Sequence, residues 1–219
     1  MKKRAAVVLL CSLLAGAVYG EVFLDLVKTG SPAEVLQAIK SGANVNDRYP
    51  NGRTPLMNAA GNNTNPEVIT LLLKAGSDIT ATDREGMTPL SIAAWFNRNA
   101  EVLSVLLQAG SDVNTKDKGG RTPLMYAAGN TPSPDVVAVL LKAGADVSPA
   151  DEYGRTPLIY AARSNATPQA GAVVSLLLKA GADGKAKDHE GKTAFDYAKV
   201  NPLLKGTKQY KDLSDAMHK

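Results

Sequence analysis

The stretch Gly120-Arg121-Thr122-Pro123-Leu124-Met125-Tyr126-Ala127-Ala128 decides the fold, because related stretches recur before and after it. The related stretches begin at Gly52, Gly86, Gly154 and, in a weaker form, Gly191. These five glycines are separated by 34, 34, 34 and 37 residues. A period in this range is typical of a helical repeat array, in which each unit buries its apolar face only against its neighbours. The sequence therefore predicts an all-α solenoid of repeated helix pairs with short turn fingers.

Each copy carries residues that can start a short helix. Glycine tolerates the positive φ of a tight turn, threonine can cap a helix N-terminus, and proline suits the first helical position. Pairs of alanine, whose small side chains let helices approach closely, follow at 59–60, 93–94, 127–128 and 161–162. The pattern predicts that one helix begins at each Thr-Pro pair.

A second helix is expected after each of these short helices. Apolar runs occupy residues 68–73, 102–107, 136–141 and 173–178. They are followed by Gly76, Gly110, Gly144 and Gly181, at the position where a glycine in the left-handed conformation commonly ends a helix. An aspartate follows each of these glycines two residues later. We expect one leucine of each run to lie in the core, namely Leu71, Leu106, Leu140 and Leu177.

This unit resembles the ankyrin repeat, whose pattern combines Gly-x-Thr-Pro-Leu-His-x-Ala-Ala with Leu-Leu-Leu-x-x-Gly-Ala-Asp. There are two departures from the family. The usual histidine is replaced by Met57, Ser91, Met125 and Ile159, so the polar network of that histidine is expected to be absent. The period is also one residue longer than is usual, and the added residue falls between the two helices. The resemblance implies a scaffold whose surface residues, rather than its fold, select a protein partner.

The resemblance covers residues 21–219. We expect an N-terminal cap repeat over residues 21–51, full repeats over 52–85, 86–119, 120–153 and 154–190, and a C-terminal cap repeat over 191–219. In the first repeat Ser31-Pro32 is expected to start the second helix. Pro202 should interrupt the last repeat before a final helix with Tyr210, Leu213 and Met217 on one face.

One of the loops inside the repeats differs from its siblings. Asn65-Pro66 and Ser133-Pro134 combine a capping residue with proline at the start of a second helix, but the equivalent Thr167-Pro168 is displaced by three residues. This displacement predicts about one additional turn in the second helix of that repeat.

The first 20 residues have the pattern of a secretory signal peptide. Lys2, Lys3 and Arg4 form a basic start, and an apolar stretch follows from Ala5 to Val18. Small residues favour cleavage after Gly20, with cleavage after Ala17 as the second choice. The alternative is a retained membrane anchor. We expect export to the periplasm or beyond, with no membrane contact apart from that of the signal peptide.

The charge and cysteine content of the mature chain follow from this prediction. The full chain has 25 Lys and Arg against 21 Asp and Glu. Removing the signal peptide leaves 22 basic against 21 acidic residues and removes Cys11, the single cysteine. A scattered, nearly balanced charge gives no indication of nucleic-acid binding. A thiol-free chain suits an oxidising compartment and has no cysteine ligands for a metal.

No motif of catalysis or metal binding is found in the sequence. His189 and His218 are the only histidines, and neither has an acidic partner at metal-ligand spacing on a helix. An aspartate recurs three residues before each repeat's glycine, at Asp83, Asp117, Asp151 and Asp188. We interpret these aspartates as turn formers that bond their own backbone. The sequence therefore predicts neither an enzyme nor a cofactor, and it favours a monomeric binding module over a structural envelope protein.

The binding surface is predicted from the two residues that follow each Ala-Ala pair, which the family resemblance places on the concave groove. They are Gly61-Asn62, Trp95-Phe96, Gly129-Asn130 and Arg163-Ser164. Because three of the four pairs are small or polar, core packing does not obviously explain Trp95 and Phe96, and we expect them to anchor a partner. The alternative is that both aromatics pack inward, Phe96 under its own loop and Trp95 over Tyr126. Around them we place a polar rim of Arg84, Glu85, Met87, Lys118, Arg121, Glu152, Tyr153 and Arg155.

Overall fold

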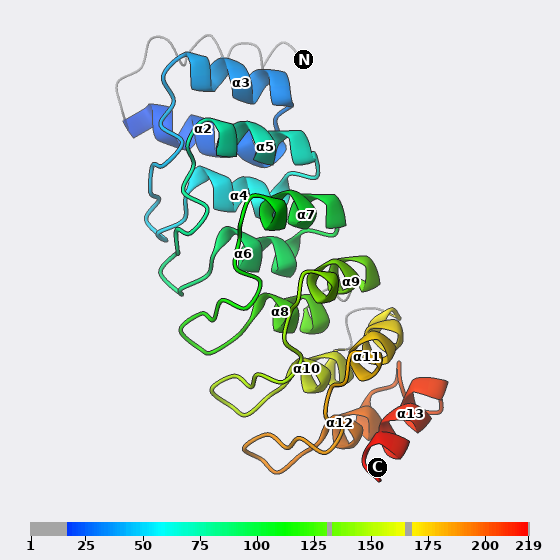
Figure 1. Cartoon of the computed structure of the whole chain (residues 1–219). Coiled ribbons are helices and arrows are strands. Elements are labelled where there is room, and N and C mark those ends of the chain that lie inside the picture. The colour runs from blue at the N-terminus through cyan, green and yellow to red at the C-terminus, as the bar shows by residue number, and fades with distance from the viewer. Residues whose placement is uncertain (1–16, 131–132, 165–167, 219) are drawn as a thin grey trace. The chain divides into compact units, whose positions relative to one another are not determined.

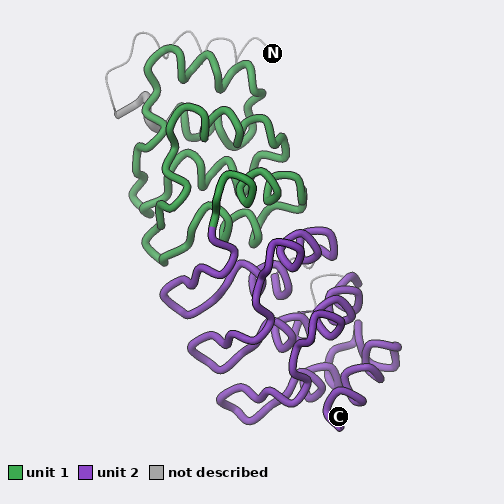
Figure 2. Tube along the Cα trace, viewed as in Figure 1, with its two compact units in different colours: residues 1–111 green, residues 112–219 purple. Residues whose placement is uncertain are grey.

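The computed structural model describes residues 17–130, 133–164 and 168–218. The chain divides into two compact units, unit 1 over residues 1–111 and unit 2 over residues 112–219 (Figure 2). Within the described residues the regular structure is helical, and the β-pairing is limited to a single bridge between Lys187 and Thr193. The predicted all-α repeat fold is therefore confirmed.

The described part of unit 1 consists of helix pairs (Figure 1). The pairs are α2 (Ala17–Thr29) with α3 (Pro32–Lys40), α4 (Pro55–Asn62) with α5 (Pro66–Lys74), and α6 (Pro89–Phe96) with α7 (Ala100–Gln108). The first helices pack in the order α2, α4, α6, and the second helices pack in the order α3, α5, α7. Each pair thus covers the next, as a repeat array requires.

Unit 2 repeats the same arrangement. Its pairs are α8 (Pro123–Gly129) with α9 (Pro134–Lys142), α10 (Pro157–Arg163) with α11 (Ala170–Lys179), and α12 (Ala194–Val200) with α13 (Lys208–Ala216). Helix α10 packs between α8 and α12, and α11 packs between α9 and α13. In both units, short first helices form one layer and second helices form the other.

The predicted start and stop signals act where the sequence puts them. Thr54, Thr88, Thr122, Thr156 and Thr193 are the N-cap residues of the first helices that they precede, and each hydroxyl accepts the N–H of the residue three positions later. At the other end of the second helices, Gly76, Gly110, Gly144 and Gly181 have φ between 87° and 99°. A side chain in that conformation is strained, so glycine ends each of these helices.

Local contacts take the place of the histidine network that is usual in the family. The Ser91 hydroxyl lies 3.1 Å from the Thr88 hydroxyl, and both groups are buried. The sulfur of Met57 accepts the N–H of Thr54 at 3.4 Å, which is a weak version of a reciprocal cap. Met125 makes the same contact with Thr122, whereas Ile159 in α10 has no polar group with which to do so.

The cores include at least one fully buried leucine in each second helix from α5 to α11 and the paired alanines of the first helices, beside other apolar side chains such as Ile69 and Leu90. Leu106, Leu140 and Leu177 are fully buried, as predicted. The prediction for Leu71 is wrong by one position, because Leu72 is the buried residue and Leu71 is partly exposed. Leu72 is the residue in register with the other three, since it precedes Leu106 by 34 residues.

Both ends of the chain carry the expected helices. Ser31 caps α3 and Thr207 caps α13, and Leu213 on α13 is buried. Most of the predicted signal peptide, residues 1–16, lies outside the described residues. Helix α2 begins at Ala17, so both predicted cleavage positions fall at its start or in its first turns. Its buried side chains Phe23 and Val27 lie beyond both positions.

The displaced proline predicts one additional turn in the second helix of its repeat, and this prediction is wrong. Helix α11 has 10 residues and begins at Ala170 with Gln169 as N-cap, whereas α9 has 9 residues. Pro168 and Gln169 form a turn before the helix. Most of the three-residue insertion therefore lengthens the loop, of which residues 165–167 lie outside the description.

Candidate functional site

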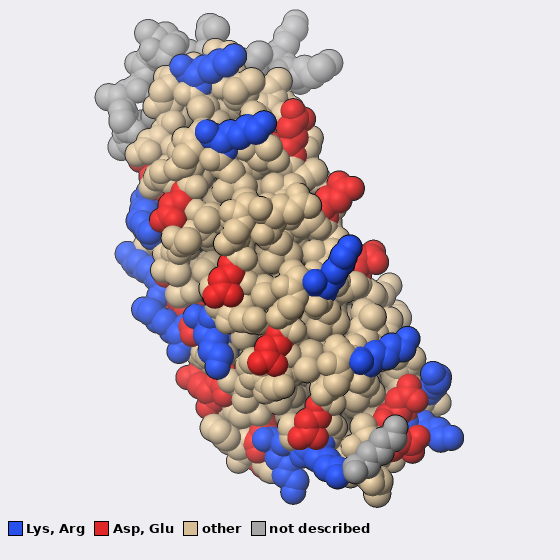
Figure 3. Space-filling model, viewed as in Figure 1, with Lys and Arg blue, Asp and Glu red and all other residues tan. Residues whose placement is uncertain are grey.

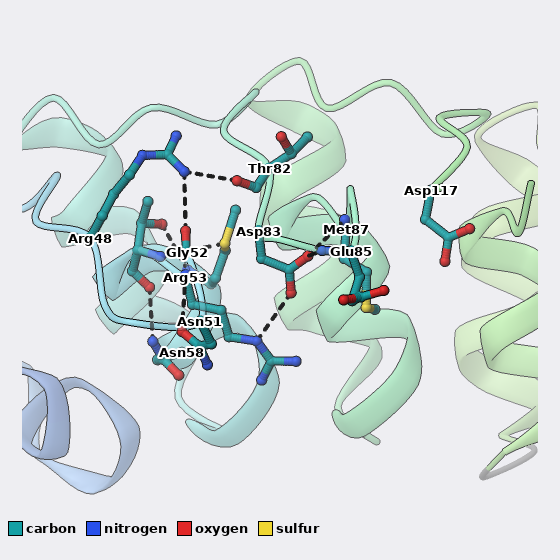
Figure 4. Close-up of polar contacts among 12 residues, drawn as sticks. Arg48, Asn51, Gly52, Arg53, Asn58, Thr82, Asp83, Glu85, Met87 and Asp117 are labelled. Carbon is teal, nitrogen blue, oxygen red and sulfur yellow. Dashed lines mark hydrogen bonds and ion pairs between the residues drawn. The ribbon is translucent and has the colours of Figure 1, made fainter. Parts of the chain in front are cut away.

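A finger turn precedes each first helix from α4 to α12. We use this term for residues 49–53, 83–87, 117–121, 151–155 and 188–192. In the last four, the N–H of the leading aspartate donates to the carbonyl of the fifth residue at 3.0–3.1 Å. The same aspartate accepts two backbone N–H groups at its Oδ1, as at Asp83 from Glu85 and Met87 (Figure 4). The interpretation of Asp83, Asp117, Asp151 and Asp188 as turn formers is confirmed.

Successive fingers within a unit are joined through their backbones. In unit 1 the N–H of Arg84 donates to the carbonyl of Asn51 at 3.1 Å. In unit 2 the N–H groups of Glu152 and His189 donate to the carbonyls of Gly119 and Tyr153, both at 2.9 Å. A Cβ atom at Gly52 would lie 2.9 Å from the Arg84 nitrogen, so the close approach of these fingers depends on glycine.

Two arginines add side-chain bonds between the fingers of unit 1. Arg48 donates to the carbonyls of Gly52 and Thr82 at 3.1 and 2.8 Å, and Arg53 pairs with Asp83 at 3.2 Å (Figure 4). The Asp83 carboxylate is buried and the Arg53 side chain is mostly covered. These bonds hold one repeat's finger against the next.

Most residues of the predicted polar rim are accessible. Arg84, Glu85, Lys118, Glu152 and Tyr153 are exposed, and Arg121 and Arg155 are partly exposed. Met87 is an exception, since it is only 1% exposed and packs in the core just before the Thr88 cap. Met87 therefore has to be removed from the predicted surface. Arg84 and Glu85 belong to unit 1, and the other accessible rim residues belong to unit 2.

Trp95 and Phe96 end helix α6 and stack on each other, with ring centroids 4.7 Å apart and planes 14° apart. Phe96 is 47% exposed, and Trp95 is partly exposed. The Arg53 guanidinium lies 5.7 Å from the centre of the Phe96 ring. Gly61 on α4 makes room for this arrangement, because a Cβ there would lie 2.9 Å from Ile92 and 3.7 Å from Phe96. Phe96 thus rests on the preceding repeat with much of its ring in solvent.

In unit 2 a tyrosine takes the place of Arg53 at each finger aspartate. The hydroxyl groups of Tyr126, Tyr160 and Tyr197 donate to Oδ2 of Asp117, Asp151 and Asp188, and Tyr160 does so at 2.7 Å. Burial and these hydrogen bonds raise the pKa of all three tyrosines. We did not predict these bonds, although the constant spacing of nine residues between aspartate and tyrosine is visible in the sequence.

Buried asparagines form a second set of contacts that we did not predict. The Asn97 amide donates to the carbonyls of Ala60 and Asn63, both at 2.9 Å, and Asn63 bonds the end of α2 in the same way. In unit 2, Asn201 donates to Ala162 and Ser164. Each asparagine satisfies carbonyls at the end of the preceding first helix, which otherwise lack partners.

The described residues offer little that would suit catalysis. They hold no group of three or more His, Cys, Asp or Glu side chains placed to bind a metal ion. His189 and His218 are both exposed, at a finger and at the C-terminal end. Lys and Arg side chains are interspersed with Asp and Glu side chains in each unit on the face drawn in Figure 3. None of the described helices has the length and apolar character to cross a membrane.

The chain is a repeat protein built from stacked helix pairs. Threonine caps its first helices from α4 to α12, glycine ends its second helices from α5 to α11, and finger turns join the pairs. The sequence profile described as ankyrin repeats (3 copies) matches residues 24–117 and 99–188. The chain is a member of the ankyrin-repeat family. A search of curated proteins gave no match. Ankyrin repeats are generally protein–protein interaction modules, and ankyrin-repeat proteins are typically non-enzymatic scaffolds.

Proposed function

We propose that this chain is a non-catalytic scaffold that binds a partner protein in an exported compartment, and that Trp95 and Phe96 anchor the partner. The exposure of Phe96 carries the proposal. A large aromatic side chain that is 47% exposed on a helix end leaves apolar surface in water. Burial of that surface by a partner would stabilise the complex, and aromatic anchors of this kind contribute much of the energy of protein interfaces.

The geometry around Phe96 supports an anchor. Its ring is held by stacking on Trp95 and by contact with the preceding repeat, so little side-chain freedom remains to be lost on binding. Arg53, which lies over the ring, is itself fixed by its ion pair with Asp83. Arg84 and Glu85 on the adjacent finger are exposed and supply polar groups for the rim of the interface. In unit 2, Lys118, Arg121, Glu152, Tyr153 and Arg155 form a separate group of accessible residues, which we propose as that unit's own contact surface for the partner.

The exported location rests on the sequence of the first 20 residues. A basic start and a short apolar stretch are the features that secretion pathways use. Cleavage after Gly20 would shorten α2 but would leave its buried residues Phe23 and Val27 in place. N-terminal sequencing of the protein from a periplasmic fraction should find a chain that begins near Glu21. A chain that still begins at Met1 in the cytosol would contradict the proposal.

Capture of the partner by cross-linking from the exported fraction tests the anchor. We expect Phe96→Ala and Trp95→Ala to reduce capture, the latter by about 2 kcal/mol or more in binding free energy, while the circular dichroism spectrum is unchanged. Val200→Ala is the matched control, because Val200 is 79% exposed on unit 2. Equal capture by all three variants would refute the role of the aromatics.

Tryptophan emission provides an independent measurement, because Trp95 is the only tryptophan of the chain. Emission should shift to the blue when the partner covers the surface. Unfolding of the Trp95→Ala variant, rather than loss of binding, would assign the pair to the core. Absence of any saturable partner would favour a structural role in the envelope. An activity lost through a single acidic substitution would favour an enzyme.

A further inference from the structure

Two arginines at opposite ends of α10 make no ion pair with any described residue. Arg155 lies just before the Thr156 cap, and Arg163 is the last residue of the helix. Each guanidinium instead lies over a tyrosine ring, Arg155 at 4.6 Å from the centre of Tyr153 and Arg163 at 5.0 Å from the centre of Tyr197. Both positions are in unit 2.

Two other basic side chains of these fingers have ion-pair partners, whereas Lys118 makes no ion pair with a described residue. Arg121 is paired with Asp117 at 3.0 Å, and the Glu152 carboxylate lies close to the same finger, beside Gly119. Lys192 is paired with Glu190 at 2.7 Å. Of the three arginines of unit 2, Arg155 and Arg163 are therefore the two that have no ion-pair partner among the described residues.

Arg155 differs from its siblings because it makes no bond to a finger aspartate. Arg53 and Arg121 each donate Nε–H to Oδ2 of a finger aspartate. At the equivalent place Tyr160 occupies Oδ2 of Asp151 at 2.7 Å, and the buried Nε of Arg155 has no hydrogen-bond partner among the described residues. A buried donor without an acceptor is costly, so an acceptor that allows the guanidinium to turn toward it would be favoured.

Asp188 is close enough for the charge of Arg155 to act on it, but its carboxylate is already occupied. Its carboxylate accepts the Tyr197 hydroxyl and the N–H groups of Glu190 and Lys192. Burial opposes ionisation of Asp188, but these bonds and the charge of Arg155 lower its pKa. Asp188 therefore remains charged without forming an ion pair with Arg155.

We propose that Arg155 and Arg163 bind two carboxylates of an acidic, extended segment of the partner protein. The proposal rests on the proposed function and deepens it, because it specifies the chemistry of the partner segment that unit 2 would recognise. Arginine matches a carboxylate with two parallel hydrogen bonds, and each of these guanidinium groups lies over a tyrosine ring rather than against a described carboxylate. Arg155 and Arg163 are eight positions apart, about 12 Å at the rise of a helix, so the two cations fit carboxylates about four residues, or about 13 Å, apart in an extended chain.

The probe for this proposal is a fluorescein-labelled Gly-Ser peptide with two glutamates four residues apart, measured by fluorescence anisotropy with the full-length protein. The wild type should bind the peptide, and added salt should weaken binding because the contacts are ionic. Arg155→Gln and Arg163→Gln should each weaken binding by about tenfold or more. Arg163→Lys should retain only part of the affinity, since lysine keeps the charge but cannot form two parallel hydrogen bonds to one carboxylate.

Arg98→Gln is the matched control, because Arg98 is an exposed arginine of unit 1. It should bind the peptide as the wild type does, and so should Phe96→Ala, which separates this site from the aromatic anchor. Arg163 is exposed, so its variants should melt as the wild type does. The proposal is overturned if the wild type does not bind the peptide, if the glutamine variants bind it equally well, or if a peptide with glutamines in place of glutamates binds as tightly. Binding of a phosphoserine peptide but not of the glutamate peptide would also overturn it, and would indicate a phosphate site.

Discussion

The two units use the same finger aspartate but anchor it differently. In unit 1 the second oxygen of Asp83 is bound by Arg53, which belongs to the finger of the preceding repeat. In unit 2 the second oxygens of Asp117, Asp151 and Asp188 are bound by tyrosines of the helix that immediately follows. A unit 1 finger is thus tied to its neighbour, whereas a unit 2 finger is tied to its own helix.

This difference follows from one residue in each repeat. The position nine residues after the finger aspartate is Ile92 in unit 1 and Tyr126, Tyr160 and Tyr197 in unit 2. Isoleucine has no hydroxyl to donate, so Asp83 takes a partner from outside its repeat. At Asp117 both Tyr126 and Arg121 bind this oxygen, whereas at Asp151 Tyr160 binds it and Arg155 does not. The comparison shows that a substitution within the helix can decide whether a finger is tied to its own helix or to the preceding finger.

The largest expected effect compares equivalent core leucines of the two units. Leu106 in unit 1 and Leu140 in unit 2 are fully buried on second helices. Changing either to alanine should leave a cavity and cost about 2–5 kcal/mol of unfolding free energy. Because repeats are stabilised mainly by their neighbours, hydrogen exchange should show lost protection in the mutated repeat and those beside it first. Equal loss of protection along the whole chain would contradict this localisation.

The next effect concerns the tyrosine anchors. Tyr160→Phe removes the only hydrogen bond to Oδ2 of Asp151 that the structure shows, and should cost about 1–2 kcal/mol in urea denaturation. Tyr126→Phe should cost less, since Arg121 still binds Asp117 at 3.0 Å. Equal costs for the two variants would indicate that Arg121 does not support its finger.

The tyrosine anchors also predict a loss of stability at alkaline pH. The pKa values of Tyr126, Tyr160 and Tyr197 are raised in the folded chain, so below about pH 10, the unfolded value, their contribution is fully present. Above that pH the unfolded tyrosines lose protons while the folded ones keep them, and stability falls. The loss should be roughly 1 kcal/mol per pH unit for the buried Tyr126.

Tyrosinate absorbance recorded beside the circular dichroism signal measures this loss. We expect ionisation of the three tyrosines to coincide with unfolding of unit 2. Tyr126→Phe should weaken the pH dependence of stability, whereas Ile92→Val, a core change of similar position in unit 1, should leave it unchanged. If the three tyrosines ionised at about pH 10, as free tyrosine does, before any unfolding, their hydroxyl groups would not be held by the aspartates.

The repeat architecture could be predicted closely from the sequence because its signals are local. Thr-Pro starts, glycine stops and the turn-forming role of Asp83 and its equivalents depend on residues within a few positions. The wrong predictions concern residues whose burial depends on the register of a helix or on the direction of a side chain. The sequence predicts Leu71 in the core and Met87 on the surface, whereas Leu72 and Met87 are the buried residues.

The candidate site could be predicted only in part. The unusual Trp95-Phe96 pair was visible by comparing repeats, but the exposure of Phe96 depends on Gly61 and Ile92 of two different helices. Arg121 binds its finger aspartate and Arg155 does not, although their sequence contexts are alike, so only three-dimensional contacts reveal the difference. The nine-residue spacing from aspartate to tyrosine can be interpreted as a hydrogen bond only once the two side chains are known to lie beside each other.

The smallest effect is the sharpest comparison of the two units, because it makes the same substitution in each. Arg53→Gln removes the side-chain partner of Oδ2 of the buried Asp83 and should cost about 1 kcal/mol. Arg121→Gln removes an equivalent bond to Asp117, but the Tyr126 hydroxyl still binds that oxygen, so the cost should be about 0.5 kcal/mol or less. Urea denaturation of both variants measures the difference. If Arg121→Gln is the more harmful, the tyrosine is not the main anchor in unit 2. If the double variant Arg121→Gln with Tyr126→Phe costs clearly more than the sum of its single changes, the two groups substitute for each other at one carboxylate, as the structure implies.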